Sequence, residues 1–317
     1  MQRTLWLSLA PLAAAGLLAG CGGSGISTSR PAGAILQAAN STVLGGSFEM
    51  TFSAHLQADL SHVTGLSGVN ATELAVIQDE INAATLQGTV EYQGPQDLEA
   101  TFSLPPLLTS PWHVIDLNGV EYVSEDGSHW YQAAKSSSSQ VLGGQTLNGL
   151  KAEFKTWGQQ LKGSSQVVNL GVSTVGGVRI DHLQSTVPAA ALNTFMSQAL
   201  SGVLSKLPSS TPKLGGDLTA IEQLIRFTGA RGDSYVRTDN GRLARATSTV
   251  GMDLELGALS LLAPKQSGLP SGYASLTFDF AGNLSDYGQT FNIQKPSQVL
   301  PGRPPTPSGL GGALSSL

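Results

Sequence analysis

The chain has 317 residues, of which 17 are lysine or arginine and 22 are aspartate or glutamate, so its formal net charge at pH 7 is −5. An acidic chain without a basic cluster is a poor ligand for nucleic acid, because phosphate neutralisation requires clustered cations. The hydrophobic share of 40% is sufficient for a folded core, and the single cysteine excludes an intramolecular disulfide and a thiolate-rich metal site.

The first 20 residues have the pattern of a bacterial lipoprotein signal peptide. Arg3 precedes an apolar run that ends at Leu18 and is too short and interrupted to span a membrane. The motif LAGC, which ends at Cys21, matches a lipobox, in which the thiol receives a diacylglyceryl group. An ordinary signal peptide that ends near a cysteine by chance is the alternative. The sequence therefore predicts removal of residues 1–20 and a lipid anchor at Cys21, which would hold the exported chain on the outer face of the cell membrane.

Residues 31–298 are expected to form the folded body. Residues 21–30 form a tether rich in Gly and Ser, and the Pro-, Gly- and Ser-rich residues 299–317 are expected to be disordered. Apolar and polar residues alternate over 48–60, which predicts a long antiparallel strand with one buried face. Further strands are expected over 89–93, 98–104, 113–116, 120–124, 130–133, 167–173, 178–186, 234–238, 243–256, 273–281 and 290–294.

Glycine-containing pairs predict hairpin turns between several of these strands. They are Asn118-Gly119, Asp126-Gly127, Gly176-Gly177 and Asn240-Gly241. A helical period predicts amphipathic helices over 70–86, 147–162, 189–207 and 217–228. The order of elements indicates an α+β fold, in which one large curved antiparallel sheet, a half-barrel, wraps around amphipathic helices on its concave face.

The common catalytic motifs are absent from the sequence. The sequence has no nucleophile elbow, no HExxH motif, no Walker loop and no dinucleotide-binding glycine motif. Residues 210–213 match S-x-x-K but lie among prolines, and the tripeptide at 231–233, RGD, is expected to precede a strand. His55 and His62 are seven positions apart on or just after a predicted strand, so their side chains are expected on opposite faces and do not predict a metal-binding pair. No enzyme activity, metal or cofactor is therefore predicted, and a hydrolase with an unrecognised site is the least favoured class.

Several segments are similar to one family of bacterial envelope lipoproteins. They are the lipobox, an opening helix near 32–40, and the segments SFEMTFSAHLQADL, GGVRIDHLQSTVPAAALNTFM, YVRTDNGRLARATSTVGMDL and LTFDFAGNLSDYGQTFNIQKP. Over residues 31–298 the chain resembles the actinobacterial LppX/LprG-type lipoproteins, whose fold is akin to that of the carriers LolA and LolB. The resemblance implies an apolar cavity for acyl chains and carriage of a lipid or lipoglycan across the envelope, with a membrane transporter as a candidate partner.

Six inward positions are predicted to line such a cavity. They are Phe52, Leu56, Phe195, Met196, Leu200 and Leu204. The alternative is a solid core, because an apolar sheet face and amphipathic helices usually close fully on each other. The two leading hypotheses are thus a lipid-binding and transfer protein and a non-enzymatic envelope scaffold or sensor with a filled core.

Overall fold

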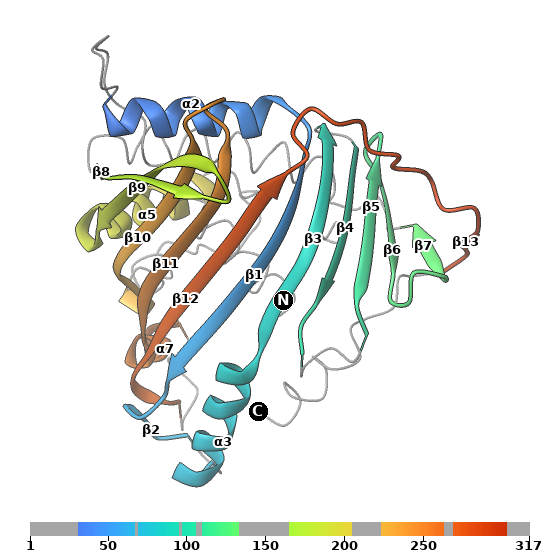
Figure 1. Ribbon diagram of the computed structural model, residues 1–317. Helices are drawn as coiled ribbons and strands as arrows, with labels where there is room; N and C mark the ends of the chain where they lie inside the picture. Colours follow the sequence, from blue (N-terminus) through green and yellow to red (C-terminus); the bar gives the residue numbers. More distant parts are fainter. Residues whose placement is uncertain are drawn as a thin grey trace.

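One open, curved sheet of 13 strands dominates the computed structural model (Figure 1). The structure describes residues 31–66, 69–94, 97–105, 110–132, 165–204, 223–262 and 269–302. Within this part of the chain, the strand pairs are antiparallel except for β13 and β7. The predicted α+β fold, built on a large curved antiparallel sheet, is therefore confirmed.

The sheet has two halves, each made of strands that are consecutive in the chain. The first half contains β1 (Phe48–Asp59), β3 (Thr85–Gly94), β4 (Asp97–Ser103), β5 (Trp112–Leu117), β6 (Val120–Ser124) and β7 (Trp130–Gln132). The second half contains β8 (Gln166–Val175), β9 (Val178–Pro188), β10 (Ile225–Arg237), β11 (Leu243–Glu255) and β12 (Ser271–Ser285). The short strands β2 (Val63–Thr64) and β13 (Val299–Leu300) pair with β12 and β7. β1 and β12 pair in the middle and join the halves.

Three helices pack on or beside this sheet. α2 (Ala32–Gly45) crosses the ends of the strands, from the side of β8 to the start of β1, and α5 (Ala189–Leu204) lies behind β9 and β10 (Figure 1). α3 (Ala71–Ala83) lies at the end of β1 and starts with a capping box, in which the Asn70 side chain accepts hydrogen bonds from the backbone of Thr72 and Glu73. A short 3-10 turn, η1 (Leu256–Ala258), and α7 (Leu259–Leu262) follow β11. In the part of the chain that is described, no helix is long and apolar enough to cross a membrane.

α2 and α5 pack on the same face of the sheet, which we call the inner face. The α2 cluster combines Leu36 and Ala39 of the helix with residues of the sheet, which are Leu183, Val236, Leu243 and Ala246. The α5 cluster combines Leu192 and Phe195 with Val187, Phe227, Ala230, Val250 and Met252. Both clusters lie over β9–β11, so these helices close only one half of the inner face.

Several expectations from the sequence differ from the structure. The helix predicted over 70–86 ends at Ala83, because β3 begins at Thr85. The end of the helix predicted over 217–228 is wrong, because Ile225 already begins β10, where Phe227 pairs with Met252 in the α5 cluster. Consequently RGD 231–233 lies inside a strand rather than before one. No regular strand forms over 290–294, where the backbone N–H of Phe291 donates instead to the side chain of Gln93. The helix predicted over 147–162 lies outside the described residues.

The body extends slightly beyond residue 298. Val299 and Leu300 pair in parallel with Trp130 and Tyr131 at the edge of the sheet. Residues 303–317 lie outside the described part of the chain.

Candidate functional site: the inner face of the sheet

The alternation along β1 places six apolar side chains on the inner face. They are Phe48, Met50, Phe52, Ala54, Leu56 and Ala58. Ala54 and Leu56 form a β1 cluster with Phe278 of β12. Leu276 packs against both the β1 cluster and the α5 cluster. The apolar surface is therefore continuous from β1 to the helix-covered half of the sheet.

The structure brings the predicted cavity residues onto this one surface in two pairs. Phe52 and Leu56 lie on β1, and Phe195 and Met196 lie on α5, with Leu276 between the pairs. Leu56 and Phe195 are buried, whereas Phe52 and Met196 are only half-buried. Leu200 and Leu204 belong to α5, but their side chains lie outside what the structure describes.

Half-buried aromatic rings mark the part of the inner face that the described helices leave open. Phe52 of β1 lies beside Phe280 of β12, with ring centroids 6.4 Å apart, and Phe102 of β4 lies two strands away. All three rings are half-buried. We call Phe52, Phe102 and Phe280 the aromatic patch. Its half-buried rings offer a surface on which an apolar ligand could bind.

Two glycines flank Phe52 on the neighbouring strands. The register places Gly88 of β3 and Gly282 of β12 directly opposite it. A Cβ atom at Gly282 would lie 3.3 Å from both Met50 Sδ and the Phe280 ring, so the missing side chain makes room for these groups. Neither these glycines nor Phe102 and Phe280 are among the site residues predicted from the sequence. A glycine inside a strand pattern is the signal that indicates such a close approach.

A depression of about 350 Å³ lies where β1, β3 and β4 run side by side. Its lining combines aromatic, glycine and polar residues, which are Thr51, Phe52, Gln87, Gly88, Thr89, Thr101, Phe102, Ser103 and Pro111. This volume falls in the lower part of the range for small-molecule sites. Five of these residues, Thr51, Gln87, Thr89, Thr101 and Ser103, alternate with Phe52, Gly88 and Phe102 along their strands, so their side chains lie on the outer face of the sheet. This recess therefore opens on the face opposite the aromatic patch.

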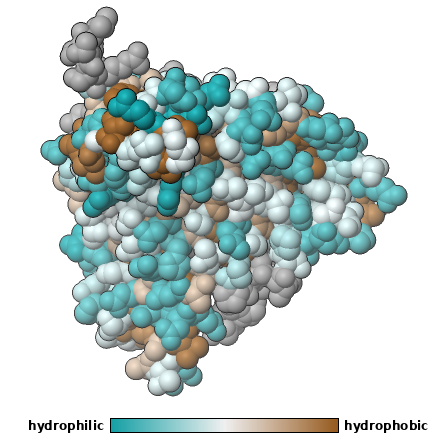
Figure 2. Space-filling view, in the orientation of Figure 1, coloured by the Kyte–Doolittle hydropathy of each residue, from teal (hydrophilic) through white to brown (hydrophobic). Residues whose placement is uncertain are grey.

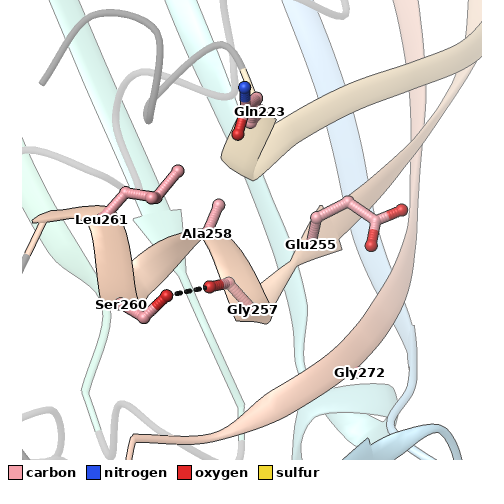
Figure 3. A pocket seen from close by; sticks show the side chains of 7 residues that line it. All are labelled: Gln223, Glu255, Gly257, Ala258, Ser260, Leu261 and Gly272. Atoms are coloured by element: carbon pink, nitrogen blue, oxygen red, sulfur yellow. Dashed lines mark hydrogen bonds between the residues drawn. The ribbon is translucent and has the colours of Figure 1, made fainter. Parts of the chain in front are cut away.

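A second recess of about 450 Å³ lies at the end of β11 (Figure 3). It is lined by Gln223, Glu255, Gly257, Ala258, Ser260, Leu261 and Gly272. Figure 3 shows Ala258 on the side of Gln223, whereas the Glu255 carboxylate points away from it. The Ser260 hydroxyl donates to the Gly257 carbonyl oxygen at 2.7 Å, so it is engaged within its own turn. The lining of this recess is mixed and comes from a short stretch around the end of β11, unlike the apolar surface that continues across the inner face.

The described histidines have structural partners. His55 Nε2 lies 2.6 Å from the Asn82 carbonyl oxygen, and His62 stacks on Tyr273 with centroids 4.5 Å apart. His182 Nε2 lies 2.8 Å from Asp233 Oδ1. Among the residues that the structure describes, no group of three His, Cys, Asp or Glu side chains could hold a metal ion.

Shifted pKa values occur away from the aromatic patch. Hydrogen bonds from the backbone and side chain of His129 lower the pKa of Asp126, in the loop between β6 and β7. Burial, and then the nearby charge of Glu91, raises the pKa of Glu99 on β4. Neither carboxylate belongs to the aromatic patch, whose three members are phenylalanines. Two other carboxyl groups, those of Asp116 and Glu121, are paired across β5 and β6 and are buried on the inner face farther along the sheet.

The chain matches several solved structures over most of its length. It matches LppX from Mycobacterium tuberculosis at 11% identity and a TM-score of 0.33, covering 82% of this chain and 97% of that one. LprF from Mycobacterium bovis matches at 13% identity and a TM-score of 0.37, over 84% and 96% of the two chains. A domain classed with outer membrane lipoprotein-sorting proteins, from Vibrio parahaemolyticus, matches at 9% identity and a TM-score of 0.20, over 80% and 90%.

No family model and no curated protein sequence matches the chain. LppX belongs to the group that the sequence motifs resemble. Because a fold does not determine a function, the function of this chain depends on its own side chains.

Proposed function

We propose that this chain is an envelope lipoprotein, anchored through Cys21, that binds the acyl chains of a lipid or lipoglycan on the inner face of its sheet and transfers them. The observation that carries the proposal is the aromatic patch. Its three rings remain half-buried beside the buried residues of the α5 and β1 clusters. In a filled core of this size, large rings at the centre of the sheet would be expected to be buried.

The chemistry of the patch suits an acyl chain. Contact between a hydrocarbon chain and these rings would remove apolar surface from water, at about 25 cal/mol per Å². The inward residues of β1 carry no charge, so the recognition would concern chain length and shape more than the headgroup.

Two methionines border this surface and make it adaptable. Met50 Sδ lies close to Gly282, and Met196 packs on the α5 cluster while remaining half-buried. Unbranched thioether side chains adjust to irregular shapes. A protein that must accept and release its cargo benefits from such a wall, and it needs no catalytic group.

Paired substitutions test the proposal. Phe280→Gln changes the patch, and Phe227→Gln makes the same change at a residue that is 2% exposed in the α5 cluster. Phe280→Gln is expected to fold and to lose most binding of cis-parinaric acid, measured by fluorescence titration. Phe227→Gln is expected to lower the free energy of unfolding by about 3–5 kcal/mol.

Mass spectrometry of extracts from the purified wild-type chain gives the second measurement. Co-purified acyl lipid is expected in the wild type and is expected to decrease in Phe280→Gln. Absence of lipid and of probe uptake in the wild type, with equal destabilisation by both substitutions, would instead support the filled-core scaffold or sensor.

A further inference from the structure

The strand at one edge of the sheet, β8, exposes large apolar side chains. Four of the six exposed large hydrophobic residues in the described part of the chain lie in it, which are Val168 at 48%, Leu170 at 53%, Val172 at 48% and Val175 at 61% exposure. Figure 2 shows hydrophobic atoms gathered over the position of β8 on a face that is otherwise mostly hydrophilic. The other two residues, Val76 and Leu261, are single and lie in separate helices.

β8 also lacks the charges that usually protect an edge. Its ten residues, QVVNLGVSTV, include no charged side chain. Natural edge strands commonly carry lysine or another charge, because exposed apolar edges associate with other chains. An uncharged apolar edge therefore indicates a surface that something else covers.

The backbone of β8 is unsuited to pairing with an added strand. Its register shifts between Asn169 and Gly171, and Gly171 has a φ of 120°. The Asn169 side chain accepts a hydrogen bond from the Gly171 backbone at 2.8 Å and donates one to Asp181 at 3.2 Å. Such a bulge twists an edge and interrupts the ladder that a partner strand would need. This geometry indicates that β8 is covered by a fluid apolar surface rather than by an added strand.

The start of the folded body brings β8 close to the expected lipid anchor. Val167 of β8 and Ala32, the first residue of α2, pack against the same α2 cluster. Cys21 precedes Ala32 by eleven positions, which span at most about 40 Å when fully extended. An anchor at Cys21 therefore holds the exposed side chains of β8 within reach of the bilayer.

We propose that β8 and the Gly176-Gly177 turn after it dock on the lipid bilayer surface, with Val168, Leu170, Val172 and Val175 inserted at the headgroup boundary. This inference rests on the proposed anchoring at Cys21. Interfacial apolar side chains typically reach about 5–10 Å into the boundary. Docking would change a freely tethered body into one with a fixed orientation on the membrane.

Site-specific labelling tests this docking on the lipidated full chain. Once Cys21 carries its lipid, an introduced cysteine is the single free thiol of the chain. Leu170→Cys, Val175→Cys and the control Val76→Cys are labelled with the fluorophore NBD. The chains are reconstituted in phosphatidylcholine–phosphatidylglycerol vesicles that contain doxyl-labelled phosphatidylcholine. Quenching at 170 and 175 is expected to exceed that at 76 by roughly twofold or more, because only the first two positions would lie at the interface.

The outcomes separate this inference from the proposed function. Equal quenching at all three positions, in chains that sediment with the vesicles, would overturn the docking and leave the anchor intact. Failure to sediment would overturn both. Cross-linking of position 170 between copies, with little quenching, would assign β8 to a protein interface and also overturn the docking. Uptake of cis-parinaric acid by Leu170→Cys is expected to equal that of the wild type.

Discussion

Tyr287 joins the end of β12 to the start of β11. Its hydroxyl donates to the Leu243 carbonyl oxygen at 2.7 Å, and the Arg242 guanidinium lies 5.3 Å from the centre of its ring. Burial raises the pKa of the hydroxyl, and the Arg242 charge acts in the opposite direction. The hydroxyl therefore remains a proton donor at all ordinary pH values.

Tyr287→Phe is expected to lower the free energy of unfolding by about 1 kcal/mol, because it removes one hydrogen bond and leaves the ring in place. Chemical denaturation measures this change. Tyr273→Phe is the matched control, since it keeps the ring that stacks on His62. An equal effect of the two substitutions would show that the Leu243 hydrogen bond is not the cause.

Glu99 gives a prediction about pH. It lies opposite Glu91 in the β3–β4 register, and burial followed by the Glu91 charge raises its pKa. A carboxyl group with a raised pKa in the folded state is easier to protonate there than in the unfolded state. It therefore destabilises the fold as the pH rises from the ordinary glutamate pKa through the raised value.

Glu99→Gln is expected to raise Tm at pH 7 by about one to two degrees, the scale of a partly exposed charge. The gain is expected to vanish below about pH 4, where the unfolded carboxyl is also protonated. Thermal denaturation at both pH values measures it, with a Glu80→Gln control on the exposed side of α3. A gain that persisted at low pH would have a cause other than ionisation.

At the scale of strands, the flanking glycines of Phe52 have different surroundings. A Cβ atom at Gly88 would collide with the carbonyl oxygen of Thr101, which belongs to the β4 backbone. At Gly282 the nearest atoms belong to the flexible side chains of Met50 and Phe280. The first glycine is therefore required by the sheet, and the second preserves room beside the aromatic patch.

Gly88→Ala is expected to lower the free energy of unfolding by about 1–3 kcal/mol, because two strands must move apart. Gly282→Ala is expected to cost less than about 1 kcal/mol but to weaken uptake of cis-parinaric acid, since the added methyl group occupies space at the patch. Denaturation and fluorescence titration of the pair give both values. Unchanged uptake in Gly282→Ala would place the ligand elsewhere.

The elements that the sequence predicts well are those with clear periodicity. Alternation over 48–60 predicts β1 to within one residue of its end at Asp59. The predicted Asn118-Gly119 pair forms the β5–β6 turn, with a positive φ at both residues. The strand predicted over 234–238 covers only the end of β10. The inner positions of its earlier part include Ala230, Gly232 and Ser234, which give no clear apolar alternation. The pairing of β13 with β7 joins two short segments far apart in the chain, which local patterns cannot indicate.

The candidate site is only partly predictable for a related reason. Parity alone assigns Phe52 and Leu56 to the inner face. The position of Gly88 and Gly282 beside Phe52 depends on strand register, which single-strand patterns do not specify. The division between buried Phe195 and half-buried Met196 depends on how α5 sits on the sheet.

At the scale of the whole molecule, Cys21 is expected to determine where the protein resides. Cys21→Ala is expected to abolish fatty-acid labelling and to leave a product that is soluble or retains its signal peptide, whereas the wild type partitions with membranes. Membrane fractionation after labelling measures both properties. Ser24→Ala, in the same tether, is the control. Fatty-acid labelling of Cys21→Ala at the wild-type level would contradict the lipobox assignment.

The central pairing of β1 with β12 determines the order in which the sheet can assemble. Consecutive hairpins within each half bring together residues that are close in sequence, whereas the Phe52–Gly282 pair closes a loop that contains most of the chain. Closure of so long a loop is slow. We therefore expect the strands within each half to pair first and the β1–β12 pairing to form last. During synthesis from the N-terminus, one edge of β1 must wait for a strand that is made near the end. The inner face is therefore completed only when almost the whole body is present, and a chain cut short before β12 would keep an open edge at its centre.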